Sequence, residues 1–305
     1  MRIRKIGAAL SAGTLMFALA ACGGDDDPAT TPTSTQGGES EEPSEEEPAE
    51  FEAGTTMAEL AEAGAITVGT KFDQPGFGQE NLEGELEGFD VEVAKIIAGE
   101  LGITPENIEW FETTSAIREE AIEGGDVDFV VATYTINEER AQRITFAGPY
   151  YTAGQQIMVL SENEEISGPE AFTDNPDLSV CSVTGSTPSE TIRDYLASED
   201  QLVLFETYTE CADSLGNGQV DAVTTDNVIL LGFASASEGA YKLVGEQFTE
   251  EPYGIGITKG DVEFCEFINQ TLQDNEDAYL AAWDATAGQI EGTQVPELPE
   301  PGECV

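Results

Sequence analysis

The sequence contains no histidine, and among its 305 residues only 11 are Lys or Arg, against 61 Asp and Glu. Without histidine the chain cannot form a Ser-His-Asp or Cys-His catalytic unit or a His-ligated zinc site, and it has no imidazole pH switch. The formal charge of −50 disfavours binding to nucleic acid or to an anionic lipid surface, because basic faces bind phosphate. Apolar residues still make up 40% of the chain, which suffices for a packed core, and the length favours two domains.

The first 21 residues have the features of a bacterial export signal. Three basic residues precede an apolar run over residues 6–21, which is 16 residues long. A membrane-spanning helix needs about 20. The run ends in Leu-Ala-Ala followed by Cys22 and glycine, which resembles a lipobox, where the cysteine is lipidated and becomes the mature N-terminus. We therefore expect residues 1–21 to be a lipoprotein signal peptide and Cys22 to carry a lipid anchor on the outer face of the cell membrane. An ordinary secretory signal is the alternative.

Residues 22–56 form a segment with its own composition. Residues 23–54 contain 11 acidic residues and no basic ones, together with Pro, Thr, Ser and Gly. Such a stretch buries too little apolar surface to fold, and its like charges repel and extend it. We expect a disordered acidic linker between the lipid and the folded part. An acidic tail that recruits a basic partner is the alternative.

The mature chain keeps only eight Lys and Arg residues against 61 acids. Self-repulsion of this size destabilises a compact state unless salt screens it, and the Debye length falls from about 10 Å at 0.1 M to about 3 Å at 1 M. The composition therefore suggests a saline habitat.

Beyond the linker, strand-like and helix-like segments alternate, which is typical of α/β proteins. In residues 90–101, for example, apolar side chains recur on one helix face. The first set has strands over residues 65–69, 108–111 and 127–132, and helices over 90–101 and 115–123. The second set has strands over residues 179–182, 202–205 and 222–224, and helices over 188–196, 207–215 and 227–236. Each set is a βαβαβ series, so the sequence predicts two lobes, each a mostly parallel sheet flanked by helices.

Two apolar strand-like runs, residues 155–160 and 253–258, lie where the chain would cross from the first lobe to the second and back. We therefore expect lobe 1 to comprise residues 57–155 and 254–305, and lobe 2 to comprise residues 156–253. Ligands of open α/β sheets bind beyond the carboxyl ends of the strands. The functional site is accordingly predicted in the cleft between the lobes.

Four short motifs occur in order beyond residue 57. They are EGFDV at 87–91, ATYTINEER at 132–140 with TFAGPYY at 145–151, VTGST at 183–187 and DAVTTD at 221–226. In this combination the chain resembles the polar amino-acid substrate-binding proteins of ABC importers, most of all their glutamate-binding branch. The resemblance implies a type II periplasmic binding protein fold with two hinge strands. It also implies an amino acid held between two closing lobes and delivered to the permease subunits of an ABC transporter.

A bound amino acid presents a carboxylate and an ammonium group, and a closed cleft must pair both, because burying bare charges is very unfavourable. Arg140 follows the strand over 127–132 at a helix start, so its guanidinium can grip the carboxylate with two hydrogen bonds. Thr135 offers a hydroxyl to the same carboxylate, and Thr133 offers its hydroxyl or carbonyl to the ammonium. The alternatives are a surface salt bridge for Arg140 and solvation of a turn by the two threonines.

The second lobe offers partners from across the cleft. Ser186 and Thr187 stand where a strand ends and a helix begins, so backbone N–H groups there complete the carboxylate cradle. Asp226 follows the strand over 222–224 and is the natural partner of the α-ammonium. For both positions, a helix N-cap without a ligand is the alternative.

Specificity for the ligand's side chain is predicted to depend on Lys71, in the loop after the first strand. In the glutamine-binding branch of the family the matching position tends to be acidic, which suits an amide donor, whereas a lysine favours a carboxylate. The sequence therefore favours glutamate, with aspartate and glutamine as alternatives. Phe89 is expected either to pack on the ligand's methylene groups or to belong to the core.

Five cysteines minus Cys22 leave four in an exported domain, which predicts two disulfides with three possible pairings. We favour Cys181–Cys211, which would tie the strand before the Thr-Gly-Ser-Thr turn to a neighbouring helix. The second pair would then be Cys265–Cys304, which fastens the C-terminal tail to a helix.

The chain is therefore expected to be a monomeric, lipid-anchored, extracytoplasmic binding protein and not an enzyme. Neither a cofactor nor a metal nor a nucleic-acid partner is expected, and the anchor would be the contact with the membrane. The alternative from another class is an enzyme on the same scaffold, a cyclohexadienyl dehydratase-like lyase or a lytic murein enzyme. Such an enzyme needs an acid–base pair, for which the predicted cleft supplies Asp73 and Asp226.

Overall fold

The structure, a computed structural model, describes residues 51–304. The expected signal peptide, the lipidation site Cys22 and most of the expected linker lie outside the described residues. Over residues 51–304, no helix combines the length and the apolar character needed to cross a membrane. Helix α1 (Thr56–Ala63) begins inside the expected linker, where Thr55 is its N-cap. Phe51 packs edge-on against Phe267 with ring centroids 5.6 Å apart, so order begins before the sequence predicted it.

Lobe 1 is built on a five-stranded sheet with the order β5-β1-β6-β13-β7. Its strands are β1 (Ile66–Thr70), β5 (Ile108–Glu112), β6 (Phe129–Val130), β7 (Thr145–Ala153) and β13 (Glu251–Ile257). Strands β5, β1 and β6 run parallel, whereas β13 is antiparallel to both of its neighbours. Its other elements are α2 (Phe89–Glu100), η1 (Pro105–Asn107), α3 (Arg118–Gly124), α4 (Glu138–Ala141), α9 (Val262–Asp274), α10 (Glu276–Ala285) and η4 (Ala287–Gln289). Helix α2 packs because Val93, Ala94 and Ile97 recur at helical spacing and are all buried.

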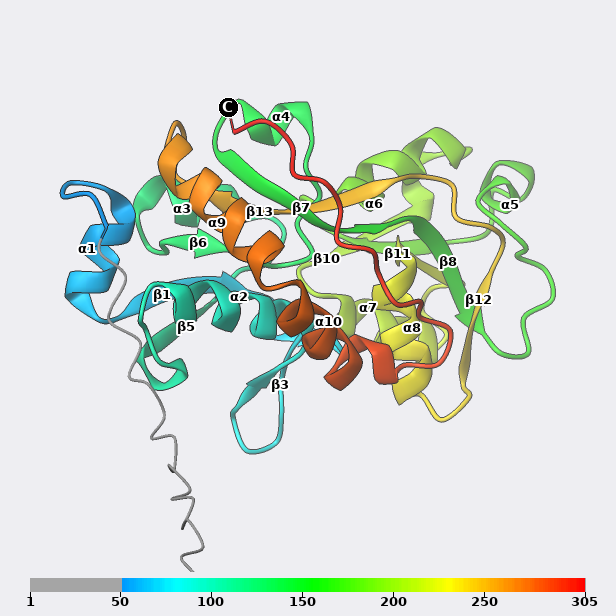
Figure 1. Cartoon of the computed structure of the whole chain (residues 1–305). Helices are drawn as coiled ribbons and strands as arrows, with labels where there is room; N and C mark the ends of the chain where they lie inside the picture. The colour runs from blue at the N-terminus through cyan, green and yellow to red at the C-terminus, as the bar shows by residue number, and fades with distance from the viewer. Residues whose placement is uncertain (1–50, 305) are drawn as a thin grey trace, which may run out of the picture. The chain divides into compact units, whose positions relative to one another are not determined.

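A small antiparallel sheet is inserted between β1 and α2. It consists of β2 (Asp73–Gln74), β3 (Gly78–Glu80) and β4 (Leu86–Glu87). Figure 1 shows β3 and the loop that follows it projecting away from the lobe 1 sheet. The connection between β2 and β3 faces lobe 2, where Pro75 lies against Gly232.

Lobe 2 is built on a second five-stranded sheet with the order β10-β9-β11-β8-β12. Its strands are β8 (Gln155–Leu160), β9 (Val180–Val183), β10 (Leu202–Phe205), β11 (Ala222–Asp226) and β12 (Tyr241–Val244). Strands β10, β9 and β11 run parallel, and β8 is antiparallel to both β11 and β12. Its helices are α5 (Glu170–Asp174), α6 (Thr187–Thr191), η2 (Ile192–Tyr195), η3 (Glu199–Gln201), α7 (Tyr208–Gly216) and α8 (Asn227–Ala236). The chain passes from β7 to β8 at Gly154 and returns from β12 to β13 through residues 245–250.

Two of the differences from the sequence prediction lie beside the cleft. The strand expected over residues 127–132 pairs as β6 only at Phe129–Val130, because the chain then bends into a left-handed conformation at Thr133, with φ +43°. The helix expected from Ser115 begins at Arg118, which leaves residues 113–117 as a loop at the carboxyl end of β5. In both places, polar residues that could have continued a regular element face the cleft instead.

Two disulfides cross-link the described residues, in the pairings favoured from the sequence. Cys181–Cys211 joins β9 to α7, and Cys265–Cys304 joins α9 to the C-terminal segment. In Figure 1 this segment, coloured red, runs from the region of α8 over β7 toward α4. Gly292 lies against Leu231 of α8, and the Gly302 amide donates to the Gly148 carbonyl at 2.7 Å. The segment therefore touches lobe 2 but is fastened to lobe 1.

Candidate functional site

A small cavity lies between the two lobes. We call it the inner cavity. Its lining comes mainly from the carboxyl ends of the parallel strands β5, β6, β9, β10 and β11 and from the segments that follow them: Gln74, Ser115, Arg118, Thr133 and Thr135 of lobe 1, and Ser186, Thr187, Pro188, Tyr208, Thr225, Asp226 and Ile229 of lobe 2. This is the place at which open α/β sheets bind ligands. The lining is predominantly polar, which suits a small charged ligand.

The lobes touch each other around the inner cavity, so the structure has the cleft closed. The Asp73 carboxylate accepts a hydrogen bond from the Tyr208 amide at 2.8 Å, at the start of α7. Arg140 Nη2 donates to the Gly185 carbonyl at 3.0 Å. These contacts join residues far apart in the sequence, and the carboxylate of Asp73 serves as a contact between the lobes.

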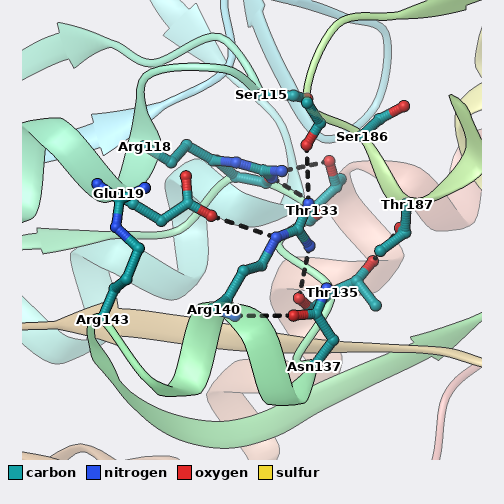
Figure 2. A network of polar contacts seen from close by, with 12 residues as sticks. Ser115, Arg118, Glu119, Thr133, Thr135, Asn137, Arg140, Arg143, Ser186 and Thr187 are labelled. Atoms are coloured by element: carbon teal, nitrogen blue, oxygen red, sulfur yellow. Dashed lines mark hydrogen bonds and ion pairs between the residues drawn. The ribbon is translucent and has the colours of Figure 1, made fainter. Parts of the chain in front are cut away.

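Arg140 is held in place on three sides (Figure 2). Its Nη1 donates to the Thr135 carbonyl at 2.6 Å, its Nε lies 3.2 Å from Glu119 Oε1, and its Nη2 reaches Gly185. Burial, and next the charge of Arg118, lower the pKa of Arg140 to about 10. Arg140 therefore makes a buried ion pair with Glu119 and not the surface salt bridge that the sequence offered as the alternative.

Arg118 is a second buried arginine that the sequence analysis did not select. It is 2% exposed, and its Nη1 donates to the Ala132 carbonyl at 2.9 Å. Its Nε has no hydrogen-bond partner within the described part of the chain. The guanidinium carbon lies 4.0 Å from the ring centroid of Tyr134, and that of Arg140 lies 5.1 Å from the same centroid, which favours both cations. The signal that was missed is its position, because Arg118 follows the carboxyl end of β5 much as Arg140 follows that of β6.

Lys71 is also buried, at 4% exposure, directly after β1. Its Nζ donates to Ser115 Oγ at 2.9 Å, and Ser115 lines the inner cavity. Burial, followed by the positive charge of Arg118, lowers the pKa of Lys71 well below its usual value. The charge of the protonated lysine is therefore incompletely compensated by the residues around it, and an anion beside it would stabilise the protonated form.

Thr133 and Thr135 line the inner cavity on the lobe 1 side. The Thr133 amide donates to Asp90 Oδ2 at 2.8 Å, and its hydroxyl donates to Gln74 Oε1 at 2.9 Å. Asp90 also accepts from the Tyr150 hydroxyl at 2.7 Å, and burial raises the pKa of this carboxyl to about 6. A left-handed conformation costs a non-glycine residue on the order of 1–3 kcal/mol. Asp90 therefore holds Thr133 in a strained position that points it at the cavity.

On the lobe 2 side, Ser186 and Thr187 are committed to different contacts. Ser186 is the N-cap of α6, and its hydroxyl accepts from the Ser189 amide at 3.1 Å and donates to the Val183 carbonyl at 2.9 Å. The hydroxyl of Thr187 lies 3.3 Å from that of Thr135 across the cleft. It also donates to Glu251 Oε2 at 2.8 Å. Thr187 thus links the two lobes beside the cavity.

Asp226 precedes α8 but makes no side-chain capping bond to it. Its Oδ2 accepts from the Tyr253 hydroxyl at 2.6 Å, whereas its Oδ1 is buried and without a hydrogen-bond partner among the described residues. Burial, and next the negative charge of Glu251, raise the pKa of Asp226 to about 8. A carboxylate oxygen left unpaired at the wall of a cavity is a ready site for a cationic group.

Phe89 lies in an aromatic cluster of lobe 1 and not at the inner cavity. Its ring centroid is 5.1 Å from that of Trp283 and 5.2 Å from that of Tyr279, both in edge-on geometry. Phe89 is fully buried and is absent from the cavity lining. Phe89 therefore belongs to the core of lobe 1, which was the alternative to packing on the ligand.

Of the three buried cations of lobe 1, Arg118 lines the inner cavity itself. Lys71 contacts the lining residue Ser115, and Arg140 lines an adjacent pocket that shares Ser115, Ser186 and Thr187 with the inner cavity. Asp226 lines the inner cavity from lobe 2 with one unpaired oxygen. Such an arrangement can hold a molecule that carries both negative and positive charge. Across residues 51–304, no group of three or more His, Cys, Asp or Glu side chains is placed to hold a metal ion.

Residues 66–281 match the family of bacterial extracellular solute-binding proteins, family 3. The chain belongs to this family. The binding protein is 42% identical over 231 residues to the glutamate-binding protein GluB of Corynebacterium efficiens, with 73% of this chain and 78% of that protein covered. It is 38% identical over 219 residues to the ABC transporter glutamine-binding protein GlnH of Bacillus subtilis, with 72% of this chain and 78% of that protein covered.

Solved structures agree with this assignment. An ancestral amino-acid-binding protein, described as a precursor of cyclohexadienyl dehydratase, superposes with a TM-score of 0.69 at 30% identity, covering 76% of this chain and 99% of the other. The fold is the type II periplasmic binding protein fold that the sequence predicted, with two α/β lobes.

Proposed function

We propose that this binding protein takes up L-glutamate between its lobes and presents the closed form to the permease of an ABC importer. The observation that carries the proposal is the grouping of Lys71, Arg118 and Arg140 on the lobe 1 side of the cleft, with Asp226 on the lobe 2 side. Each of the three cations is buried. Burial, and next the charge of Arg118, lower the pKa of both Lys71 and Arg140, so the residues around these cations compensate their charge incompletely.

Two carboxylates and one ammonium match this distribution. We assign the α-carboxylate to Arg140, with Thr135 and Thr187 at hydrogen-bonding positions, because these three meet at the boundary between the lobes. Lys71 and Arg118 receive the side-chain carboxylate, and the unpaired Oδ1 of Asp226 receives the ammonium. Glutamine would leave one cation without a counter-ion, and an unpaired buried charge is costly.

The similarity to a glutamate-binding relative at 42% identity supports the same ligand. The similarity to a glutamine-binding relative at 38% makes glutamine the competitor to test, with aspartate as the shorter diacid. Closure joins ligand contacts from both lobes, so the ligand shifts the equilibrium toward the closed form that the permease recognises.

Titration calorimetry against the twenty amino acids tests the proposal, and we expect glutamate to bind most tightly. Lys71→Ala should weaken glutamate binding by about 30-fold or more, since it removes a buried partner of a charged group. Lys95→Ala is the matched control: it removes one positive charge from the surface, where Lys95 pairs with Glu92 on α2, and leaves the cleft intact. Equal affinities of Lys71→Ala and wild type for glutamate would refute the assignment.

The location follows the family, whose members are extracellular solute-binding proteins. We further propose that Cys22 carries a lipid that holds the protein at the outer face of the membrane. Labelled fatty acid should then be incorporated into the wild type and not into Cys22→Ser. Equal incorporation into that variant would contradict lipidation at Cys22.

The catalytic alternative rests on Asp226, whose raised pKa is what a general acid would need. The relatives named above are binding proteins, and in our assignment this carboxylate pairs with the ligand's ammonium. Recovery of unchanged glutamate after prolonged incubation is the expected result, and product formation would favour the enzyme.

A further inference from the structure

A second buried carboxylate, Glu251, stands next to the proposed ammonium position. It opens β13 and is only 3% exposed. Its Oε2 accepts from the Thr187 hydroxyl at 2.8 Å, and its Oε1 accepts from the Thr249 hydroxyl at 2.8 Å. Glu251 thus reaches from the segment that joins the lobes to the first residue of α6 in lobe 2.

The geometry of β13 directs Glu251 and Asp226 to the same region. Side chains two residues apart in a strand point to the same face, so Glu251 and Tyr253 share a face. The Tyr253 hydroxyl donates to Asp226 Oδ2 at 2.6 Å. The same face of β13 therefore contacts Asp226 through one residue and Thr187 through the other.

The charges around Glu251 show what it acts on. After burial, its negative charge is the largest influence that raises the pKa of Asp226. It also acts on Arg140, whose pKa it raises, although burial and Arg118 outweigh it there. Two acids thus lie near one end of the inner cavity, and Asp226 Oδ1 lacks a hydrogen-bond partner in the part of the chain that the structure describes. A cation placed against that oxygen would relieve the repulsion between them.

We propose that Glu251 is a specificity-determining residue that makes binding depend on the ligand's ammonium group. Its charge attracts the same ammonium group that Asp226 accepts, so a diacid without an ammonium loses this attraction and meets the negative charge of Glu251 instead. Its hydrogen bond also positions Thr187 at the carboxylate end. This inference rests on the proposed function, because it takes glutamate as the ligand.

The test compares glutamate with glutarate, which has the same two carboxylates and no ammonium, by titration calorimetry. Glu251→Gln removes the charge and keeps a carbonyl oxygen that can accept from Thr187. We expect this variant to bind glutamate about tenfold or more weakly and glutarate as well as or better than wild type, so the preference for glutamate falls at least tenfold. Glu251→Asp keeps the charge and should keep most of the preference even if both ligands bind less tightly.

Glu250→Gln is the matched control, since it removes a charge from the adjacent, exposed position. It should leave both affinities unchanged. If Glu251→Gln changes both affinities by the same factor, or changes neither, the inference is overturned. Glu251 would then influence only the charge state of Arg140 or the overall electrostatic potential of the cleft. Melting curves without ligand check that each variant folds. Failure of wild type to bind glutamate would instead refute the proposed function, and this inference with it.

Discussion

Closure of the lobes can be tested at Gly232, where a single added methyl group separates stability from binding. Gly232 lies inside α8 of lobe 2 and packs against the backbone of Pro75, in the β2–β3 connection of lobe 1. A Cβ at this position would lie 2.4 Å from the Pro75 carbonyl oxygen. Ordinary van der Waals contact begins at 3.4 Å, so the lobes must move apart by about 1 Å to accept Gly232→Ala.

The two effects of this substitution have opposite signs. Alanine is favoured over glycine in a helix by roughly 0.5–1 kcal/mol, so an open ligand-free protein becomes more stable. Overpacking a tight contact costs about 1–3 kcal/mol, and here it acts on the closed form alone. The neighbouring bond from the Tyr208 amide to Asp73, 2.8 Å long, lengthens when the lobes separate. We therefore expect glutamate to bind Gly232→Ala about 5- to 150-fold more weakly than wild type.

Gly99→Ala is the matched control, because Gly99 is an exposed residue of α2 and a Cβ there meets no atom within 4 Å. In melting experiments without ligand, both variants should gain roughly 2–4 °C. Calorimetry should then find weaker glutamate binding in Gly232→Ala and unchanged binding in Gly99→Ala. Wild-type affinity in Gly232→Ala would refute the reasoning, since the bound state would then lack the contact between Gly232 and Pro75.

Three further predictions concern pH, the C-terminal disulfide and salt. Because the pKa of Asp226 is raised from 3.8 to about 8, the folded protein keeps a proton that the unfolded chain releases, and stability falls as pH rises through this window. Asp226→Asn should therefore flatten the fall in melting temperature between pH 5 and about 8, and an unaltered slope would contradict the raised pKa. Cys304→Ser opens a 39-residue loop and should lower the unfolding free energy by about 3–4 kcal/mol in denaturant titrations, with little change in glutamate affinity. The melting temperature of the wild type should rise from low salt to molar NaCl, because screening weakens its self-repulsion; a flat or falling curve would remove the argument for a saline habitat.

Most of the fold could be predicted because its signals are local. Helix α8 (Asn227–Ala236) coincides with the predicted residues 227–236, and β10 (Leu202–Phe205) with the predicted residues 202–205. The predictions became inaccurate at the cleft. The shortening of β6 and the late start of α3 both result from interactions with distant residues, such as the bond from the Thr133 amide to Asp90. A local pattern contains no information about such partners.

The same limit explains which site residues were found. Arg140 was selected because it belongs to a family motif, and Lys71 because positive charges are rare in this chain. Arg118 lies in a segment whose pattern indicates only an ordinary amphipathic helix. Phe89 shows the converse case, since an aromatic residue in a motif has the same signal whether it contacts a ligand or the core. Its edge-on packing on Trp283 depends on a contact between residues far apart in the sequence.

Glu251 could not be found from the sequence because its importance comes from two neighbours in space, Thr187 and Asp226. In a chain with 61 acidic residues, one more glutamate attracts no attention. Burial is what distinguishes it, because a charge in water is screened while a charge inside a closed cleft acts on every group beside it. The large acidic excess of the surface can therefore coexist with a site for an acidic ligand. The preference for glutamate depends on the few charges that closure removes from solvent. The comparison of Glu251→Gln with Glu250→Gln tests this directly, because Glu251 is a buried acid and Glu250 is an exposed one.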